Sequence, residues 1–191
     1  MSRLHKTVKQ MFIVIEGAEH VGKTTVIDEL VKYFYKAHLT VARIKFPVKD
    51  TITGKEIYAL LDKSESPPAI VMQSLQIVNR METLSLLKTH IANCDMTIAD
   101  RYWPSTLVYG LIDNLPKEFS LKMAEFLPKP DLIFVLHGHF YNLHQDSKGC
   151  YDVFNDKIHL LYRHFADEYG WKLISNDGSP KDICRRIISE L

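Results

Sequence analysis

Short apolar runs alternate along the chain with longer segments in which apolar residues recur every three or four positions. The short runs are typical of buried strands, which we expect at residues 11–16, 40–45, 96–99, 131–136 and 171–175. The longer segments have amphipathic helical spacing and predict helices at 23–38, 53–63, 68–92, 104–112, 116–126, 151–168 and 180–190. This alternation predicts an α/β fold, a parallel five-stranded sheet with helices on both faces. Active residues should then follow the carboxyl ends of the strands.

The long expected helix 68–92 carries an asparagine and an arginine next to each other in the run "LQIVNRME". Leu75, Val78 and Leu84 form its apolar stripe. We therefore expect Asn79 and Arg80 to face away from part of that core.

The most specific pattern follows the first expected strand. Gly17, Gly22, Lys23 and Thr24 have the spacing G-x-x-x-x-G-K-[ST], placed between a strand and a helix as in a phosphate-binding loop. Backbone N–H groups and the helix N-terminus favour an anion there. Lys23 can reach the β- and γ-phosphates, and the Thr24 hydroxyl can ligate Mg²⁺. The sequence therefore predicts a P-loop NTPase-type fold that binds a nucleoside triphosphate.

Composition limits the class of protein. A chain of 191 residues fits one domain, and a net charge of +1 gives no reason to expect nucleic-acid binding. No apolar run is long enough to span a membrane, and the polar, basic start "MSRLHKTVKQ" is unlike a signal peptide. Three cysteines without metal-ligand spacing favour a reduced, cytoplasmic protein.

Charged residues follow two further expected strands. Lys49 comes after the second, and Asp100 and Arg101 come at the end of the third. An aspartate there can hold the water shell of Mg²⁺, and an arginine beside it suits a second anion. Lys49, Arg80 and Arg101 are thus candidates to converge on an acceptor phosphate. The alternative is ordinary surface ion pairing of each residue.

The order of these motifs resembles thymidylate kinase. The shared features are the strand end, the phosphate loop, Phe-Pro, Asn-Arg on a helix, "DRY" with a serine three residues later, and "LPKPDLIFVL". The resemblance runs from Met11 to the C-terminus. It implies a single kinase domain over 1–191 with a lid at about 138–150. It also implies ATP- and Mg²⁺-dependent phosphorylation of a pyrimidine deoxynucleoside monophosphate, dTMP or a modified relative, by a homodimer.

The resemblance also assigns roles to residues. ATP binding falls to Gly17, Ala18, Glu19, His20, Val21, Gly22, Lys23, Thr24, Thr25, Asn176 and Asp177. Acceptor binding falls to Glu19, Phe46, Pro47, Lys49, Gln76, Asn79, Arg80, Arg101, Ser105, Tyr109 and Tyr151. Catalysis falls to Lys23, Arg101, Glu19 and Lys148, and the metal to Thr24 and Asp100. Within these sets, Glu19 is expected to contact the 3′-hydroxyl of the sugar.

Two departures from the family pattern bear on function. Gln76 stands where the family stacks the base on a phenylalanine, so an amide replaces a flat apolar wall. His20 occupies the loop position of a catalytic arginine, and the lid segment has Lys148 as its only permanent cation. Either Lys148 or His20 substitutes for that arginine, an outside arginine is recruited, or turnover is slow. Gln76 in place of the phenylalanine suggests that the acceptor carries a different or modified pyrimidine base.

Two other functions compete with this interpretation. A deoxynucleoside kinase would use Glu16 as the base for a sugar hydroxyl, whereas an acceptor phosphate is already anionic and needs cations. Lys49, Arg80 and Arg101 favour the phosphate acceptor. A nucleotide-binding protein with weakened catalysis would suit the missing arginine, although an idle site has no need for so complete a set of charged residues.

Overall fold

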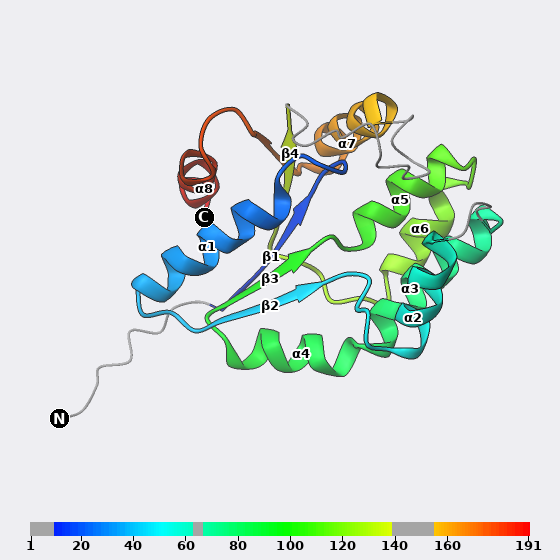
Figure 1. The fold of residues 1–191 in the computed structure, drawn as a ribbon, viewed down its shortest axis with the longest axis horizontal. Helices are drawn as coiled ribbons and strands as arrows, with labels where there is room; N and C mark the ends of the chain where they lie inside the picture. The colour runs from blue at the N-terminus through cyan, green and yellow to red at the C-terminus, as the bar shows by residue number, and fades with distance from the viewer. Residues whose placement is uncertain (1–9, 63–66, 139–154) are drawn as a thin grey trace.

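A parallel five-stranded sheet forms the centre of the molecule (Figure 1). The computed structural model describes residues 10–62, 67–138 and 155–191. The strands are β1 (Met11–Glu16), β2 (Val41–Lys45), β3 (Met96–Asp100), β4 (Leu132–His137) and β5 (Lys172–Ser175). Their spatial order is β2-β3-β1-β4-β5, and every neighbouring pair is parallel. All the strands expected from the sequence are confirmed, with bounds that differ by one residue at some ends.

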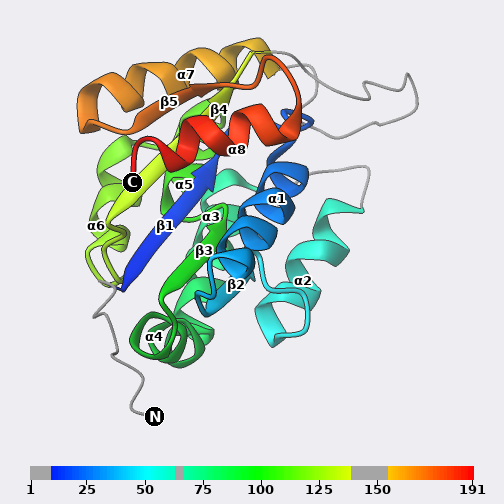
Figure 2. The same ribbon diagram turned by 90° about the vertical axis from the view of Figure 1, so that its left-hand side faces the viewer.

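Helices cover both faces of this sheet. They are α1 (Lys23–Lys36), α2 (Ile52–Leu61), α3 (Ala69–Glu82), α4 (Leu84–Asn93), α5 (Trp103–Ile112), α6 (Lys117–Ala124), α7 (Asn155–Tyr169) and α8 (Pro180–Ile188). α1 and α8 pack side by side on one face, while α4 and α7 pack on the other (Figure 2). In the part of the chain that the structure describes, none of these helices is long and apolar enough to cross a membrane.

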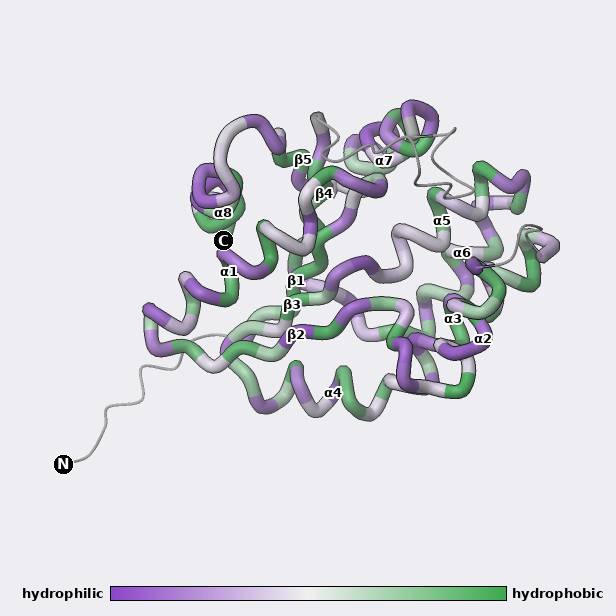
Figure 3. Tube along the Cα trace, in the orientation of Figure 1, coloured by the Kyte–Doolittle hydropathy of each residue, from purple (hydrophilic) through white to green (hydrophobic). Residues whose placement is uncertain are grey.

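The core lies where the helices meet the central strands. β1 and β3 are buried almost throughout, since neighbouring strands flank them and helices cover them. Hydrophobic residues line these strands, whereas polar residues recur along the outward sides of α1 and α8 (Figure 3). A continuous apolar run is the pattern that a strand buried on both faces requires.

The expected helix 68–92 is wrong in one respect, because the chain forms two helices there. α3 ends and α4 begins at Thr83, whose hydroxyl donates to the carbonyl oxygens of Asn79 and Arg80 at 3.0 and 3.3 Å. Side-chain bonds of this kind compete with the regular helical ladder. Ordinary helical spacing on either side of Thr83 gives no hint of this break.

The expected orientation of α3 is also wrong. Val78 is 43% exposed, whereas Asn79 and Arg80 are 0% and 1% exposed. Ile77 is the residue of this turn that enters the apolar interior. The helix therefore turns polar side chains inward, towards the loop after β2 and the start of α5. An arrangement of this kind indicates that the interior at this place serves a site as well as a core.

The register of the sheet gathers the strand ends. Lys45 of β2 and Ile15 of β1 both pair with Asp100 of β3. Gly17 comes directly after β1 and has a φ of 138°. A Cβ atom on this residue would lie 2.6 Å from the carbonyl oxygen of Leu136. Only glycine lets the loop after β1 pass so close to β4.

Candidate active site

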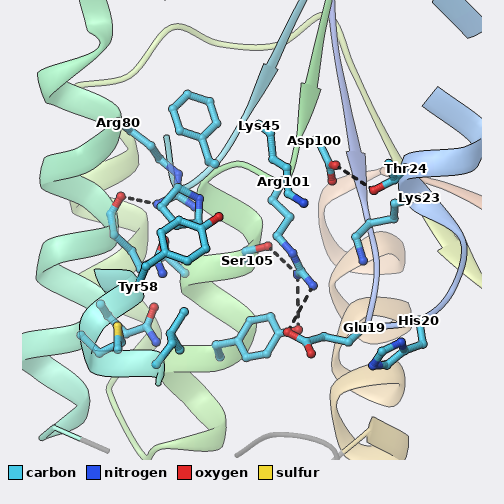
Figure 4. A pocket seen from close by; sticks show the side chains of 18 of the residues that line it. Glu19, His20, Lys23, Thr24, Lys45, Tyr58, Arg80, Asp100, Arg101 and Ser105 are labelled. Atoms are coloured by element: carbon cyan, nitrogen blue, oxygen red, sulfur yellow. Dashed lines mark hydrogen bonds and ion pairs between the residues drawn. The ribbon is translucent and has the colours of Figure 1, made fainter. Parts of the chain in front are cut away.

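A cavity of about 500 Å³ opens at the carboxyl edge of β1, β2 and β3 (Figure 4). Its walls come from the phosphate loop, the ends of β2 and β3, and helices α2, α3 and α5. The lining residues are Glu19, His20, Gly22, Lys23, Thr24, Thr25, Lys45, Phe46, Pro47, Tyr58, Leu61, Met72, Gln73, Gln76, Arg80, Asp100, Arg101, Ser105, Thr106 and Tyr109. Open parallel sheets bind ligands at the carboxyl ends of their strands, and the cavity lies at that edge.

Lys23 lies at the phosphate-loop end of this cavity. Its ammonium group donates to the carbonyl oxygens of Gly17 and Ala18 at 3.1 and 2.5 Å. Burial, with a smaller contribution from the positive charge of Arg101, lowers the pKa of Lys23 to about 7. An anion placed in the loop would favour the charged form of this lysine.

The oxygen atoms suited to a metal ion lie beside Lys23. The Thr24 hydroxyl donates to Asp100 Oδ2 at 3.4 Å (Figure 4). Mg²⁺ prefers oxygen ligands and is usually held by one or two protein groups together with substrate phosphates. The hydroxyl and the carboxylate match that donor set. Arg43 lies 3.9 Å from Asp100 Oδ2, so the carboxylate is already close to a positive charge.

Arg101 occupies the middle of the cavity, between the phosphate loop and α5 (Figure 4). Its Nη1 donates to the Gly17 carbonyl and to the hydroxyls of Ser105 and Tyr109, each at 3.3 Å. Its Nη2 lies 3.8 Å from Glu19 Oε1. Arg101 and His20 have φ values of 67° and 60°. Two non-glycine residues with backbones in the left-handed region indicate strain held in place by the surrounding fold, as is common at functional sites.

Arg80 reaches the same cavity from α3. Its Nη2 donates to the carbonyl of Tyr102 at 2.7 Å, its Nη1 donates to the carbonyl of Gln76, and its Nε has no hydrogen-bond partner among the described residues. The guanidinium also lies 5.5 Å from the centre of the Phe46 ring. Burial lowers its pKa to about 10, so it is charged at neutral pH. A buried cation bound only to carbonyl oxygens is suited to a further polar or anionic partner.

Glu16 holds the frame of the site together. The backbone N–H groups of Tyr102 and Ser105 donate to its Oε1 at 2.7 and 3.3 Å. The hydroxyls of Ser105 and Tyr162 donate to its Oε2 at 2.7 and 2.8 Å. The carboxylate is fully buried and does not line the cavity. It therefore ties β1 to the start of α5 and to α7, and so positions Arg101.

Most of the site residues expected from the sequence lie together in the cavity. Those that line it are Glu19, His20, Gly22, Lys23, Thr24, Thr25, Phe46, Pro47, Gln76, Arg80, Asp100, Arg101, Ser105 and Tyr109. Gly17, Ala18 and Val21 belong to the same loop but are buried and do not line the cavity. Asn176 donates to the Val21 carbonyl at 3.2 Å, and Asp177 is exposed beside it. Their contact with ATP stays a prediction. Lys148, Tyr151 and nearly all of the lid lie outside the described residues.

Two of the expected acceptor residues are placed differently from the rest. Lys49 is exposed, and its ammonium lies 5.4 Å from the centre of the Tyr58 ring, outside the cavity lining. Asn79 bonds the N–H and carbonyl of Val48 at 2.7 and 3.1 Å and the hydroxyl of Thr51 at 2.8 Å. Asn79 therefore supports the loop after β2 instead of contacting the cavity.

Some residues that line the cavity were not predicted from the sequence. They are Lys45, Tyr58, Leu61, Met72, Gln73 and Thr106. Lys45 ends a strand, so the strand-end rule could have found it. Gln73 lies three residues before Gln76 and seven before Arg80, which is the spacing of one helix face. No local pattern distinguishes Tyr58 or Leu61, because their role depends on where α2 packs.

Comparison with known proteins agrees with this geometry. The sequence model of a family described as thymidylate kinase matches residues 15–141, which is more than half of the chain. The chain belongs to the thymidylate kinase family. It is 29% identical over 190 residues to a thymidylate kinase of Plasmodium falciparum (isolate 3D7), with 96% of this chain and 90% of that protein covered. It is 26% identical over 187 residues to a thymidylate kinase of Dictyostelium discoideum, covering 94% and 83%.

A third relative, described as putative thymidylate kinase 251L of Invertebrate iridescent virus 6, is 27% identical over 182 residues and covers 93% and 85% of the two chains. Membership of the family makes this protein a nucleoside monophosphate kinase, a phosphotransferase. The α/β fold with a parallel sheet and a phosphate loop agrees with that class. The expected resemblance is thereby confirmed.

Proposed function

We propose that this thymidylate kinase family member transfers the γ-phosphoryl group of ATP to a pyrimidine deoxynucleoside monophosphate, dTMP or a modified relative. The observation that carries the proposal is the set of cations in one cavity. Arg80 lies on the side away from the phosphate loop, Lys45 and Arg101 lie between, and Lys23 belongs to the loop itself (Figure 4). A donor triphosphate on Lys23 and an acceptor phosphate on the other cations would place two anions end to end.

The cations also favour a phosphate acceptor over a sugar hydroxyl. Phosphoryl transfer to a phosphate needs positive charge and positioning, because the nucleophile is already an anion. A hydroxyl acceptor would gain from a general base within hydrogen-bond reach. Glu16 does not suit that role, since four donors already surround its buried carboxylate. This arrangement supports the monophosphate kinase over the deoxynucleoside kinase.

ATP and Mg²⁺ are proposed on the donor side. Thr24 and Asp100 would hold the ion, which when bound neutralises charge on the phosphates. Lys23 would bind the β- and γ-phosphates, and Arg101 would hold the acceptor phosphate in line. Glu19 lies 3.8 Å from Arg101 and would orient that guanidinium while it contacts the acceptor sugar. His20 lines the cavity at the position where a loop arginine would stabilise the transferring group.

Base selection is proposed to depend on α3. Gln76 lines the cavity at the position where an aromatic ring would stack on the base. Its amide can donate and accept hydrogen bonds, so it makes the wall polar. A pocket with this wall should accept a pyrimidine with altered substituents more readily than a purely apolar slot would.

We further propose a homodimer, as expected from the family. Val71 and Val78 are seven residues apart on α3 and are 44% and 43% exposed. Leu86 on α4 is similarly exposed. Light scattering coupled to size-exclusion chromatography should give twice the chain mass of 22.1 kDa. A mass of one chain across the working concentration range would refute the dimer.

Acceptor identity is tested by ADP release. Purified protein is mixed with Mg²⁺-ATP and with dTMP, dUMP, 5-substituted relatives or thymidine in turn. Turnover with a monophosphate and none with thymidine would support the proposal. Turnover with thymidine alone would move the chemistry to a hydroxyl acceptor. ATP binding without turnover would identify a nucleotide-binding protein.

A variant pair tests the role of Arg80. Arg80→Met should raise KM for the monophosphate at least tenfold and leave KM for ATP within about twofold. Arg163→Met is the matched control, because Arg163 is exposed on α7 and does not line the cavity. Equal effects of the two variants would contradict the assignment.

A further inference from the structure

One face of α3 presents a row of polar side chains to the cavity. Gln73, Gln76 and Arg80 are spaced by three and four residues, and all of them line the same wall. Helical geometry places such residues one above the other. Thr106 joins them from α5, which packs against α3.

Gln73 is the most unusual member of this row. Gln73 is only 3% exposed and lines the cavity, and its amide is not among the fully buried polar atoms that lack a partner among the described residues. Thr106 is 1% exposed, and its hydroxyl has no partner in the described part of the chain. Buried polar groups are normally paired, and leaving one unpaired costs roughly 1–3 kcal/mol. The unpaired Thr106 hydroxyl and the nearly buried Gln73 amide line one cavity, which indicates a ligand with matching polar atoms.

The number of polar groups exceeds what thymine offers. The polar atoms on the edge of thymine are O2, N3–H and O4, and its C5 position carries an apolar methyl group. Arg80, Thr106 and Gln76 can pair with that edge, and Gln76 is half-buried, so water can also reach it. With thymine bound, the Gln73 amide would face carbon or remain unpaired.

We propose that Gln73 determines base specificity and selects a pyrimidine monophosphate that carries a hydroxyl-bearing substituent at C5. The inference rests on the proposed function, because it names the substrate class of the same acceptor site. A hydroxymethyl group at C5 would supply the donor and acceptor that thymine lacks. The Gln73 amide can then accept from, or donate to, that hydroxyl.

The first test uses the protein without mutation. The ratio of kcat/KM for 5-hydroxymethyl-dUMP to that for dTMP is measured with Mg²⁺-ATP. An unpaired buried amide with dTMP predicts a ratio between about 5 and 150, from 1–3 kcal/mol at 1.36 kcal/mol per tenfold. A ratio of one or below would overturn the inference. Because this measurement needs no variant, a substitution that fails to fold cannot obscure it.

The second test removes the amide. Gln73→Met keeps a long, flexible, helix-favouring side chain without hydrogen-bonding groups. It should lower the hydroxymethyl-to-methyl ratio at least fivefold, partly by improving dTMP, and should leave KM for ATP unchanged. Ile70→Met is the control, because Ile70 is 46% exposed on the same helix and does not line the cavity. A ratio that falls equally in both variants, or in neither, would overturn the role of Gln73.

Further acceptors separate this inference from the proposed function. Turnover of dTMP with no preference for the hydroxymethyl nucleotide would refute the inference alone. A preference for dGMP over both pyrimidines would refute the C5 assignment, since a purine offers extra polar atoms on a larger base. Phosphorylation of nucleosides with no monophosphate turned over would refute the proposed function and the inference with it.

Discussion

The hydrogen bonds around Glu16 make a sharp prediction about stability. Glu16→Gln keeps the shape of the side chain but removes its charge and replaces one acceptor oxygen with a donor group. Four donors converge on the carboxylate at 2.7–3.3 Å. Burial and the nearby Glu16 charge raise the pKa of Tyr162, so its hydroxyl stays a donor throughout the working range.

The magnitude follows from the geometry of the two oxygens. Glutamine can keep its carbonyl oxygen against the N–H groups of Tyr102 and Ser105. Its amide nitrogen then faces two hydroxyls that must reverse from donating to accepting. Hydrogen bonds to charged groups contribute about 1.5–3 kcal/mol each, against about 1 for neutral ones. The expected loss is therefore about 2–4 kcal/mol in the free energy of unfolding, or roughly 5–15 °C in Tm for a chain of this size.

Urea unfolding followed by circular dichroism measures this loss. Tyr162→Phe and the double variant complete a cycle whose coupling energy should be about 0.5–3 kcal/mol, since the two side chains touch. Glu82→Gln is the matched control, because the Glu82 carboxylate also accepts several hydrogen bonds but is exposed, and it should lose much less. A Glu16→Gln variant within about 0.5 kcal/mol of the wild type would refute the reasoning.

Further predictions concern Lys23, His20 and Asn79. With a pKa of about 7, Lys23 is mostly neutral at pH 8, so nucleotide binding should take up about 0.9 proton there and about 0.1 at pH 6. Nucleotide affinity should accordingly fall above pH 7. Calorimetry in buffers of different ionisation enthalpy measures the proton uptake, and equal uptake at the two pH values would contradict the prediction. His20→Arg should raise kcat at least tenfold, whereas His38→Arg, an exposed site with the same φ of 60°, should leave it unchanged. Asn79→Ala should cost about 2–4 kcal/mol in urea unfolding and raise KM for the acceptor more than KM for ATP; equal changes in both KM values would argue against its support of the loop after β2.

The phosphate loop and the strands could be predicted because their patterns are local. Spacing within Gly17–Thr24 sets the loop, and a short apolar run such as Met11–Ile15 indicates a buried strand wherever it packs. The break at Thr83 could not be predicted, since only the folded chain determines whether its hydroxyl bonds to solvent or to the carbonyls of the preceding turn. The orientation of α3 could not be predicted either, because inferring it from the apolar residues presumes that the helix faces a purely apolar interior.

By itself the sequence determined the fold class, the phosphate loop and most of the residues that line the cavity. Tertiary structure alone decided which lysine lines the cavity, since the register of β2 against β3 brings Lys45 there and leaves Lys49 beside Tyr58. It likewise decided that Gln73 is nearly buried and lines the cavity. Spacing along a chain specifies which side chains share a face, but burial depends on the packing of helices that are distant in sequence. The proposed base recognition therefore depends on a contact between α3 and α5 that no local pattern encodes.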